Sequence, residues 1–367
     1  MRILFLYVVD WSRELANYER GNVPSHRLFG YPEVEKLGHY PSVCPPRPFF
    51  KWMLSKSIIW RIYQAFFALF AQKHFDVLFA VNEASSLPIL LLKRIGLLRT
   101  PIIVFNTGLM HPRNRSGLRK AMWRWLLPAA EAIVSQTRME KNTVWKEFDL
   151  REDRQFLIYM LVDLAFFEAD PHIQTSDYCL AVGTTEGKDY LTLLKAFPNE
   201  ERLVVVTDDY NAAIIAANVK PYMKVEVLQA VPIKKLRTMY QEAKLIINPL
   251  VDTAYGTGHT VVLENMALGK AVIVTEVGGI SDYFEDRVTA IGVRERDPGA
   301  LREQIRAYLR QPDQFADIGR NAKHWVKDFS CEEFTRKLLS IAEQIQPASY
   351  RRSHETLQTE EGASQTP

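Results

Sequence analysis

The residues best placed to do chemistry lie in a short stretch that joins an apolar run to a helix. A loop of small residues, 256–258, precedes His259 and Thr260, and these two residues open a predicted helix. The first turn of a helix leaves backbone N–H groups unpaired and carries the positive end of the helix dipole. Such a terminus binds phosphate groups. The stretch therefore predicts a diphosphate site at the backbone amides of Gly258, His259 and Thr260.

Glu264 lies one turn further along the same predicted helix. Its carboxylate is positioned to accept hydrogen bonds from the ribose hydroxyls of a nucleotide whose diphosphate binds at the helix start. The helix dipole favours the neutral imidazole of His259, which can hydrogen-bond a phosphate or a sugar hydroxyl. The alternative is an ordinary strand-to-helix turn, with a solvated Glu264 and with His259 packed at the edge of a cleft.

Apolar runs alternate with helical patterns along the whole chain. Strands are predicted at 1–9, 75–81, 100–106, 131–137 and 155–161, and then at 177–183, 202–209, 225–231, 244–250 and 270–277. Amphipathic helices are predicted at 56–75, 86–98, 188–197, 232–243 and 260–269. This alternation predicts an α/β fold whose parallel sheets are covered by helices on both faces. We expect two successive doubly wound units, separated by the polar segment 161–178.

The composition is that of a globular protein. Of 367 residues, 47% are apolar and 24% are charged, and this length suggests two domains. Cys44, Cys179 and Cys331 are far apart and have no metal-ligand spacing, so reduced thiols and a cytoplasmic protein are expected. The apolar run 1–9 is too short for a signal peptide. The segment 57–72 is shorter than the roughly 20 apolar residues of a membrane span, so no transmembrane helix is predicted.

The net charge of +3 is distributed unevenly. Residues 1–165 hold 23 basic and 14 acidic residues, a net charge of +9, whereas the rest of the chain has a net charge of −6. Basic residues alternate with tryptophan and other aromatic residues in 47–64 and 111–128, a pattern that suits contact with an anionic membrane surface. The alternative is a core-facing helix with an ordinary basic outer face. If these stretches contact a membrane, the protein is expected to be peripheral at the inner face of that membrane.

The stretch 258–293 resembles the donor-binding segment of family 4 glycosyltransferases (group 1). The matching residues are Glu264-Asn265-Met266-Ala267, residues 269–273 and the turn Gly278-Gly279. Segments 158–170, 180–197 and 297–330 are similar to further parts of the same family and occur in the same order. The resemblance covers residues 155–345 well, and it covers 1–154 only in general pattern.

This resemblance implies the GT-B fold, in which two Rossmann-like doubly wound domains face a central cleft. It implies an acceptor-side domain at 1–168, a donor domain at 169–330, and a helix at 331–346 that packs back on the first domain. We expect the tail 347–367 to be disordered. The implied activity is transfer of a hexose-type sugar from a nucleoside-diphosphate sugar to a saccharide or lipid-linked acceptor, with retention and without a metal or other cofactor. Polysaccharide or glycoconjugate biosynthesis is the implied setting.

The chain departs from the family pattern at the sugar end of the donor site. Gly256 stands where the family has the first of two glutamates, and Thr184 stands where arginine is common. Lys188 remains, close to Gly183 at the end of a predicted strand, and we expect it to contact phosphate rather than to be solvated. With the amides of 258–260, it is expected to bind the diphosphate, and Gly183 and Thr184 are expected to belong to the same donor-binding site.

In the first domain, Asn106 stands where relatives often carry a histidine that contacts the transferred sugar. We therefore expect Asn106 and His259 to be the catalytic residues. His111 and Glu83 are further candidates for the cleft. The pair Asp208-Asp209 is not interpreted as a metal site.

Other functional classes have less support. No strand is followed by the glycine pattern of nicotinamide-dependent oxidoreductases. The basic half has no recognised nucleic-acid-binding module, so no nucleic-acid partner is expected. The loss of the glutamate at Gly256 leaves one alternative open, a non-catalytic nucleotide-sugar-binding protein or partner subunit of a glycosyltransferase complex.

Overall fold

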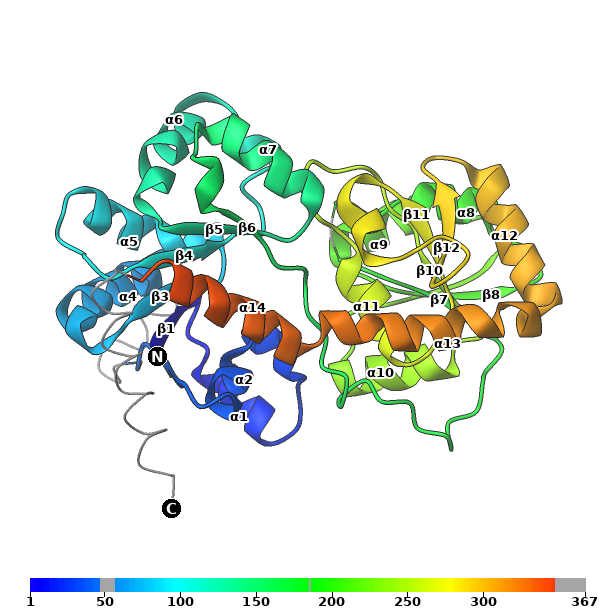
Figure 1. Cartoon of the computed structure of the whole chain (residues 1–367). Coiled ribbons are helices and arrows are strands. Elements are labelled where there is room, and N and C mark those ends of the chain that lie inside the picture. Colours follow the sequence, from blue (N-terminus) through cyan, green and yellow to red (C-terminus); the bar gives the residue numbers. More distant parts are fainter. Residues whose placement is uncertain (47–56, 185, 347–367) are drawn as a thin grey trace, which may run out of the picture.

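The computed structural model describes residues 1–46, 57–184 and 186–346, and within them the chain forms two six-stranded sheets in which all strand pairs are parallel (Figure 1). The first sheet has the order β2-β1-β3-β4-β5-β6. Its strands are β1 (Arg2–Leu6), β2 (Tyr40–Val43), β3 (Val77–Ala80), β4 (Ile102–Phe105), β5 (Ala132–Ser135) and β6 (Gln155–Leu157).

Helices lie on both sides of this sheet. They are α1 (Ser12–Glu19), η1 (Ser25–Leu28), α2 (Tyr31–Lys36), α4 (Ser57–Ala71), η3 (Gln72–His74), α5 (Glu83–Arg94), η4 (Pro112–Asn114), α6 (Gly117–Leu126), η5 (Leu127–Ala129), α7 (Arg138–Phe148) and η6 (Glu152–Arg154). Strands β3, β4 and β5 are fully buried and apolar except for Ser135, as expected for strands covered on both faces.

The second sheet has the order β12-β11-β10-β7-β8-β9. Its strands are β7 (Tyr178–Val182), β8 (Arg202–Val206), β9 (Lys224–Leu228), β10 (Leu245–Asn248), β11 (Val272–Glu276) and β12 (Ile291–Arg294). Its helices are α8 (Tyr190–Ala196), α9 (Asp209–Asn218), α10 (Ile233–Glu242), α11 (His259–Ala267), η7 (Gly278–Tyr283), α12 (Pro298–Arg310), η8 (Pro312–Phe315), α13 (Ala316–Trp325) and η9 (Val326–Phe329). The predicted α/β class with two doubly wound units is confirmed.

The last helix, α14 (Cys331–Gln344), leaves the second unit and packs on the first sheet (Figure 1). Its residues Phe334, Leu338 and Ile341 belong to the same core as Phe5 and Phe105. The segment that leads into the second domain runs beside the segment that returns, because the Val162 amide donates to the Phe329 carbonyl at 2.9 Å and the Cys331 amide donates to the Val162 carbonyl at 3.2 Å. The chain therefore crosses between the domains at one place.

The sequence prediction missed two strands, β2 and β12, and both are edge strands. Pro41 lies inside β2 and Gly292 lies inside β12, so neither strand has the continuous apolar run that marks the central strands.

Asp208 caps α9 by accepting from the Asn211 amide at 2.9 Å. The tail 347–367 and the part of the basic, aromatic stretch at 47–56 lie outside the described residues.

Candidate functional site

Loops at the carboxyl ends of the two sheets meet. The Gly256 amide of the second domain donates to the Glu140 carboxylate of α7 at 3.0 Å. The Tyr283 hydroxyl, from η7, donates to the Gln136 carbonyl at 2.8 Å. In parallel α/β sheets, ligands bind in the crevice beyond the carboxyl ends of the strands. The candidate site is therefore built from these two sets of loops.

The start of α11 is shaped by glycine. Gly258 has φ +79°, and a Cβ there would lie 2.8 Å from both terminal methyl carbons of Leu250 and 2.9 Å from Nδ2 of Asn248. Only glycine fits this left-handed, crowded position. The side-chain Nδ2 of Asn248 donates to the Gly258 carbonyl at 3.0 Å and fixes the loop that precedes α11. No side chain in the described part of the chain caps α11, so the amides of its first turn, including that of Thr260, are available to an anion.

Lys188 lies buried beside this helix start. Its Nζ donates to Asn248 Oδ1 at 2.6 Å, and burial lowers its pKa to about 7. Gly183 makes room for it, because a Cβ at Gly183 would lie 1.8 Å from the Lys188 Cε. Among the residues that the structure describes, no carboxylate forms an ion pair with Lys188. An anionic ligand would supply the missing charge and would raise the pKa of this amine.

His259 opens α11 and is held in its neutral form. Its ring stacks on Tyr283 with centroids 5.1 Å apart. Burial, with a smaller contribution from Lys188, lowers its pKa to about 4. Its Nδ1 is buried without a hydrogen-bond partner among the described residues. A Cβ at Gly256 would lie 3.1 Å from the His259 Cε1, so the imidazole occupies the space beside the position where the family has a glutamate.

Glu264 is buried, with 4% of its surface exposed, which excludes the solvated alternative. One carboxylate oxygen accepts from the Tyr240 hydroxyl at 3.0 Å. The other lies 3.6 Å from Nε2 of His26, a residue of η1 in the first domain. Burial raises the pKa of Glu264 to about 7, and burial lowers the pKa of His26 to about 4. The two side chains are therefore not a conventional ion pair, since His26 is neutral near pH 7.

The structure does not bring Asn106 to the surface of the site. Its exposed fraction is 0%. Its Oδ1 accepts from the Leu109 amide at 2.9 Å and its carbonyl accepts from Gln136 Nε2 at 2.7 Å. Its Nδ2 is buried and has no partner among the residues described. Asn106 thus lies beneath the loop that follows β4. Its hydrogen-bond partners, Leu109 and Gln136, differ from Tyr283, on which His259 stacks.

The junction between β5 and α7 holds functional candidates that the sequence analysis did not identify. Glu140 accepts from the Gln136 amide at 3.1 Å as well as from Gly256, and burial raises its pKa to about 7. Thr137 caps α7 by accepting from the Glu140 amide at 3.1 Å. Its side chain also packs on Gly279, where a Cβ would lie 2.4 Å from the Thr137 methyl carbon. A threonine followed three residues later by glutamate is a helix-start pattern that could have indicated this junction.

Thr184 lines a cavity of about 540 Å³ beyond the ends of β7 and β8, together with Glu186, Asp208, Tyr210 and Tyr255. His111 reaches toward it from the first domain, with Nε2 3.9 Å from a Glu186 carboxylate oxygen and its ring 5.4 Å from the ring of Tyr255. The two tyrosine rings offer flat apolar faces on which a planar ligand group could stack.

A second cavity, of about 430 Å³, lies in the first domain where α4, α5 and α6 begin. Its charged lining residues are Arg61, Glu83, Arg113 and Arg119. The Glu83 carboxylate is buried and accepts from the Thr107 hydroxyl at 2.9 Å. Glu83 lies near Glu140 and adds a small contribution to the rise in its pKa, after burial. This cavity therefore adjoins the side of the site that the first domain supplies.

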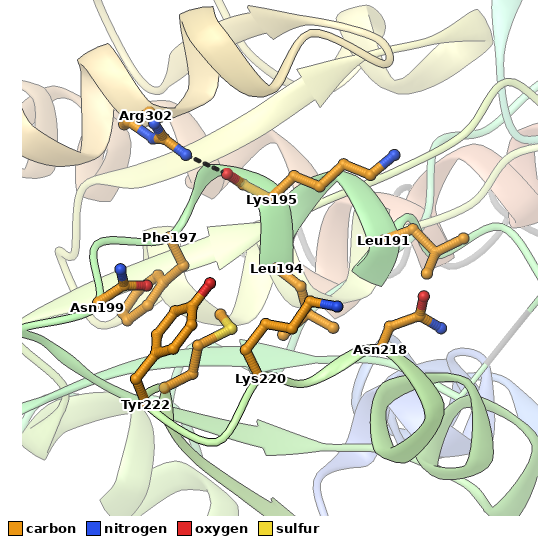
Figure 2. Close-up of a pocket in the computed structure, with 10 residues that line it drawn as sticks. Leu191, Leu194, Lys195, Phe197, Asn199, Asn218, Lys220, Tyr222 and Arg302 are labelled. Carbon is orange, nitrogen blue, oxygen red and sulfur yellow. Dashed lines mark hydrogen bonds between the residues drawn. The ribbon is translucent and has the colours of Figure 1, made fainter.

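A third cavity, of about 330 Å³, lies away from these loops between α8, α9 and α12 (Figure 2). Arg302 closes one side by donating to the Lys195 and Ala196 carbonyls. The predicted site residues are not among its lining residues. In the described ranges there is no group of three or more His, Cys, Asp or Glu side chains arranged to bind a metal. None of the helices in these ranges combines the length and the apolar composition that a membrane span requires.

Two family models match the chain in succession. The model described as Glycosyltransferase Family 4 matches residues 7–166, and the model described as Glycosyl transferases group 1 matches residues 176–311. A D-inositol 3-phosphate glycosyltransferase of Gordonia bronchialis is 28% identical over 106 residues, which are 29% of this chain and 22% of that protein. The matched regions span between 21% and 34% of the curated relatives' length.

Solved structures show the same fold over nearly the whole chain. Sucrose-phosphate synthase of Thermosynechococcus elongatus has a TM-score of 0.71 at 15% identity, covering 94% of this chain and 98% of that one. HepE of Anabaena, solved with UDP, has a TM-score of 0.68 at 14% identity, covering 94% and 100%. HepE has also been solved with UDP-glucose. These likenesses confirm the predicted GT-B architecture.

Proposed function

We propose that this chain, which belongs to the family 4 and group 1 glycosyltransferases, transfers a hexose-type sugar from a nucleoside-diphosphate sugar to an acceptor hydroxyl. One observation carries the proposal. Lys188 is buried beside the uncapped start of α11, its pKa is lowered to about 7, and it has no carboxylate partner in the part of the chain that the structure describes. A buried amine that lacks a counter-ion is costly unless a ligand supplies the negative charge.

The diphosphate of the donor would bind the amides of Gly258, His259 and Thr260 together with Lys188. The cavity lined by Thr184, Tyr210 and Tyr255 would hold the nucleoside, and Gly183, which precedes Thr184, would adjoin it. Glu264 would accept from the ribose hydroxyls. Because the Glu264 carboxylate lies against His26 of the first domain, we propose that the domains part at this contact when the nucleotide enters.

The chemistry that we propose is transfer with retention and without a metal. The acceptor oxygen forms a bond to the anomeric carbon, the bond to the diphosphate breaks, and the acceptor proton passes to the departing phosphate oxygen. The α11 dipole and the Lys188 ammonium would stabilise the charge that develops on the leaving group. Neutral His259 would hydrogen-bond the transferred sugar through its unpartnered Nδ1. The role proposed for Asn106 needs movement of the loop 107–109, because its side chain is buried.

The second candidate is a non-catalytic nucleotide-sugar-binding protein or partner subunit, and Gly256 is the observation that favours it. A glycine cannot supply the carboxylate found there in relatives. Glu140 of the first domain accepts a hydrogen bond from the Gly256 amide, which puts a carboxylate beside that position. We propose that Glu140 and His259 line the sugar end of the site in place of the missing glutamate.

Membrane contact at the first domain forms part of the proposal. Exposed apolar side chains on α4, Ile58, Ile62, Phe66 and Phe70, recur every four residues and therefore share one face. In 111–128, by contrast, Trp123 is buried, and Arg115, Lys120 and Arg124 pair with acidic residues. Support for a peripheral protein with a lipid-linked acceptor, in glycoconjugate or polysaccharide biosynthesis at the inner face of a membrane, thus comes from α4.

The activity is tested by incubating the full chain with UDP-, GDP-, ADP- and dTDP-sugars and measuring nucleotide release. Turnover of one donor is expected, and a thermal shift with the matching nucleotide should accompany it. Binding without turnover in the presence of a broad acceptor panel would favour the non-catalytic alternative. Neither binding nor turnover with any donor would refute both.

The membrane contact is tested by flotation with vesicles of phosphatidylcholine and phosphatidylglycerol at physiological salt. The full chain is expected to float with the vesicles. A variant with Phe66→Ser and Phe70→Ser should float less, because it loses exposed apolar surface from α4, whereas Leu191→Ser, an exposed apolar change on α8, should float as the wild type does. Absence of wild-type flotation would remove this part of the proposal.

A further inference from the structure

The cavity in the first domain carries more positive charge than its surroundings neutralise. Arg113 and Arg119 are exposed at its rim, and no ion pair involves either of them in residues 1–46, 57–184 and 186–346. Nearby Arg115 and Lys120, on the same segment, are both paired with Glu147. Two arginines are thus left without acidic partners, and both line one cavity.

The third arginine of the cavity is held in a fixed position. Arg61 donates from Nε to the Ser57 carbonyl at 3.1 Å and from Nη1 to the Ala84 carbonyl at 3.0 Å. Both partners are neutral carbonyl groups, so the positive charge is not compensated. A guanidinium that is anchored on one edge presents its other N–H groups in a fixed direction, which favours recognition of phosphate or carboxylate.

An unpaired donor lies in the same lining. Trp123 is 2% exposed, and its indole Nε1 has no hydrogen-bond partner among the residues that the structure describes. A buried N–H of this kind normally binds an acceptor. The guanidinium groups of Arg61, Arg113 and Arg119 give the cavity several further donors, and Glu83 is the acidic residue in its described lining.

The position of Glu83 indicates how a ligand bound in the cavity would be oriented. Glu83 opens α5 just beyond the carboxyl end of β3, and its carboxylate accepts from Thr107 in the loop after β4. Glu140, which contacts Gly256 of the second domain, follows the carboxyl end of the next strand, β5. A ligand with its anionic group on the arginines would therefore direct neighbouring hydroxyls toward Glu83 and toward the loops of the second domain. A carboxylate is suited to accept a hydrogen bond from such a hydroxyl.

We propose that this cavity binds a phosphate group of the acceptor, and that it holds the acceptor with a hydroxyl facing the donor site. The inference rests on the proposed transfer of a sugar and names the class of acceptor, a polyol or saccharide that carries phosphate. The phosphate can belong to a soluble molecule or to a lipid headgroup. Ile58 lines the cavity and also begins the exposed apolar face of α4, so a lipid chain attached to the phosphate would have an adjoining surface.

The test compares the wild type with an Arg113→Gln/Arg119→Gln variant. The control, Arg99→Gln/Arg310→Gln, removes the same charge at two exposed arginines away from this cavity. The soluble probe is glycerol 3-phosphate, titrated by calorimetry. The lipid probe is a phosphatidylcholine vesicle containing phosphatidic acid, followed by flotation.

We expect the cavity variant to lose affinity by about tenfold or more, since it removes two charge-assisted contacts, while the control stays within twofold of the wild type. Loss in the calorimetric arm identifies a soluble phosphate acceptor, and loss confined to the vesicles identifies a lipid phosphate. Equal binding of both probes by the variant and the wild type, or no binding of either probe by the wild type, overturns the inference.

Nucleotide binding separates this inference from the proposed function. Thermal shifts with UDP, GDP, ADP and dTDP are measured on the same three proteins. A shift that persists in all three while the phosphate arms fail removes the phosphate site alone. Absence of any shift in the wild type counts against the sugar-transfer proposal, whatever the phosphate arms show.

Discussion

Both sides of the site contain buried polar groups, but the two sides differ in how these groups are hydrogen-bonded within the protein. On the first domain, Glu140 accepts from two backbone amides, and the Asn106 side chain and carbonyl bind the loops around them. On the second domain, within the described residues, Lys188 has a neutral amide as its partner and the start of α11 lacks a side-chain cap. Groups that are already satisfied hold the architecture, whereas groups left unsatisfied are available to a ligand. This contrast supports the proposal that the donor diphosphate binds the second domain, while Glu140 and Asn106 support the loops of the first.

The largest effect is expected at the glycine that shapes the second-domain side. Gly258→Ala should lower the free energy of unfolding by about 3 kcal/mol or more, because a left-handed residue gains a Cβ that collides with Leu250 and Asn248. Gly96→Ala is the matched control, since Gly96 has φ +80° but no atom within 4 Å of the added Cβ. It should lose only about 1–2 kcal/mol. Urea denaturation at unchanged m-value measures both, and equal losses would show that crowding at Gly258 is unimportant.

Lys188→Met should weaken nucleoside-diphosphate affinity by up to about 3 kcal/mol, the scale of a hydrogen bond to a charged group. Calorimetry on the nucleotide selected by the donor screen measures it. Lys195→Met, an exposed lysine of α8, is the control and should bind as the wild type does. If the two variants bind alike, Lys188 is not the anion-binding residue and the contrast between the two sides is wrong.

Glu264→Ala should weaken nucleotide affinity by about 1.5–3 kcal/mol if the carboxylate binds ribose. Glu264→Gln keeps an oxygen acceptor and should lose less. The measurement is the same titration, with circular dichroism to verify folding, because the Tyr240 hydroxyl loses its partner in the alanine variant. Unchanged affinity in a folded alanine variant would limit Glu264 to its contacts with Tyr240 and His26.

Asn106→Ala should have its main effect on folding. It leaves the Leu109 amide without its acceptor, so the free energy of unfolding should fall by about 2 kcal/mol, while nucleotide affinity stays the same. Urea denaturation and the nucleotide titration together measure this. A folded variant of native stability that has lost turnover would instead restore Asn106 as a catalytic residue and blur the contrast.

The smallest effect concerns pH. The pKa of Lys188 is lowered to about 7 in the free protein, so the amine is charged below pH 7, and above it nucleotide binding must take up a proton. Affinity should be flat below pH 7 and should fall above it by at most about 1.4 kcal/mol per pH unit.

The pKa of Glu264 is also about 7, and its ionisation as pH rises would strengthen a bond to ribose. The titration is therefore made in a Glu264→Gln background. Adding Lys188→Arg, whose charge does not titrate, should abolish the slope. A slope that persists in the double variant would mean that another group takes up the proton.

The fold was predictable because its central strands are short apolar runs, such as 102–105, that alternate with helical patterns. The edge strands β2 and β12 were missed because an edge strand needs no continuous apolar run. The start of α11 was predictable for the same local reason, since Gly258 and the following helix are adjacent in the sequence. The roles proposed for the site residues stay predictions.

Contacts between the domains were beyond the reach of sequence patterns. Glu264 and His26 are 238 positions apart, and their approach at 3.6 Å depends on how the two sheets face each other. The bond from the Gly256 amide to Glu140 likewise joins residues 116 positions apart. Burial, which sets the pKa of Lys188, also arises only when β7, β10 and α11 are packed together.

Where the chain crosses between the domains, Val162 and Ser330 form a parallel bridge that holds the two crossing segments side by side. Hydrogen bonds of 2.9 and 3.2 Å join these two adjacent backbone segments. We expect the domains to move by rotation about these paired segments, because a hinge needs only small backbone rotations. That rotation would bring His26 toward Glu264 or take it away.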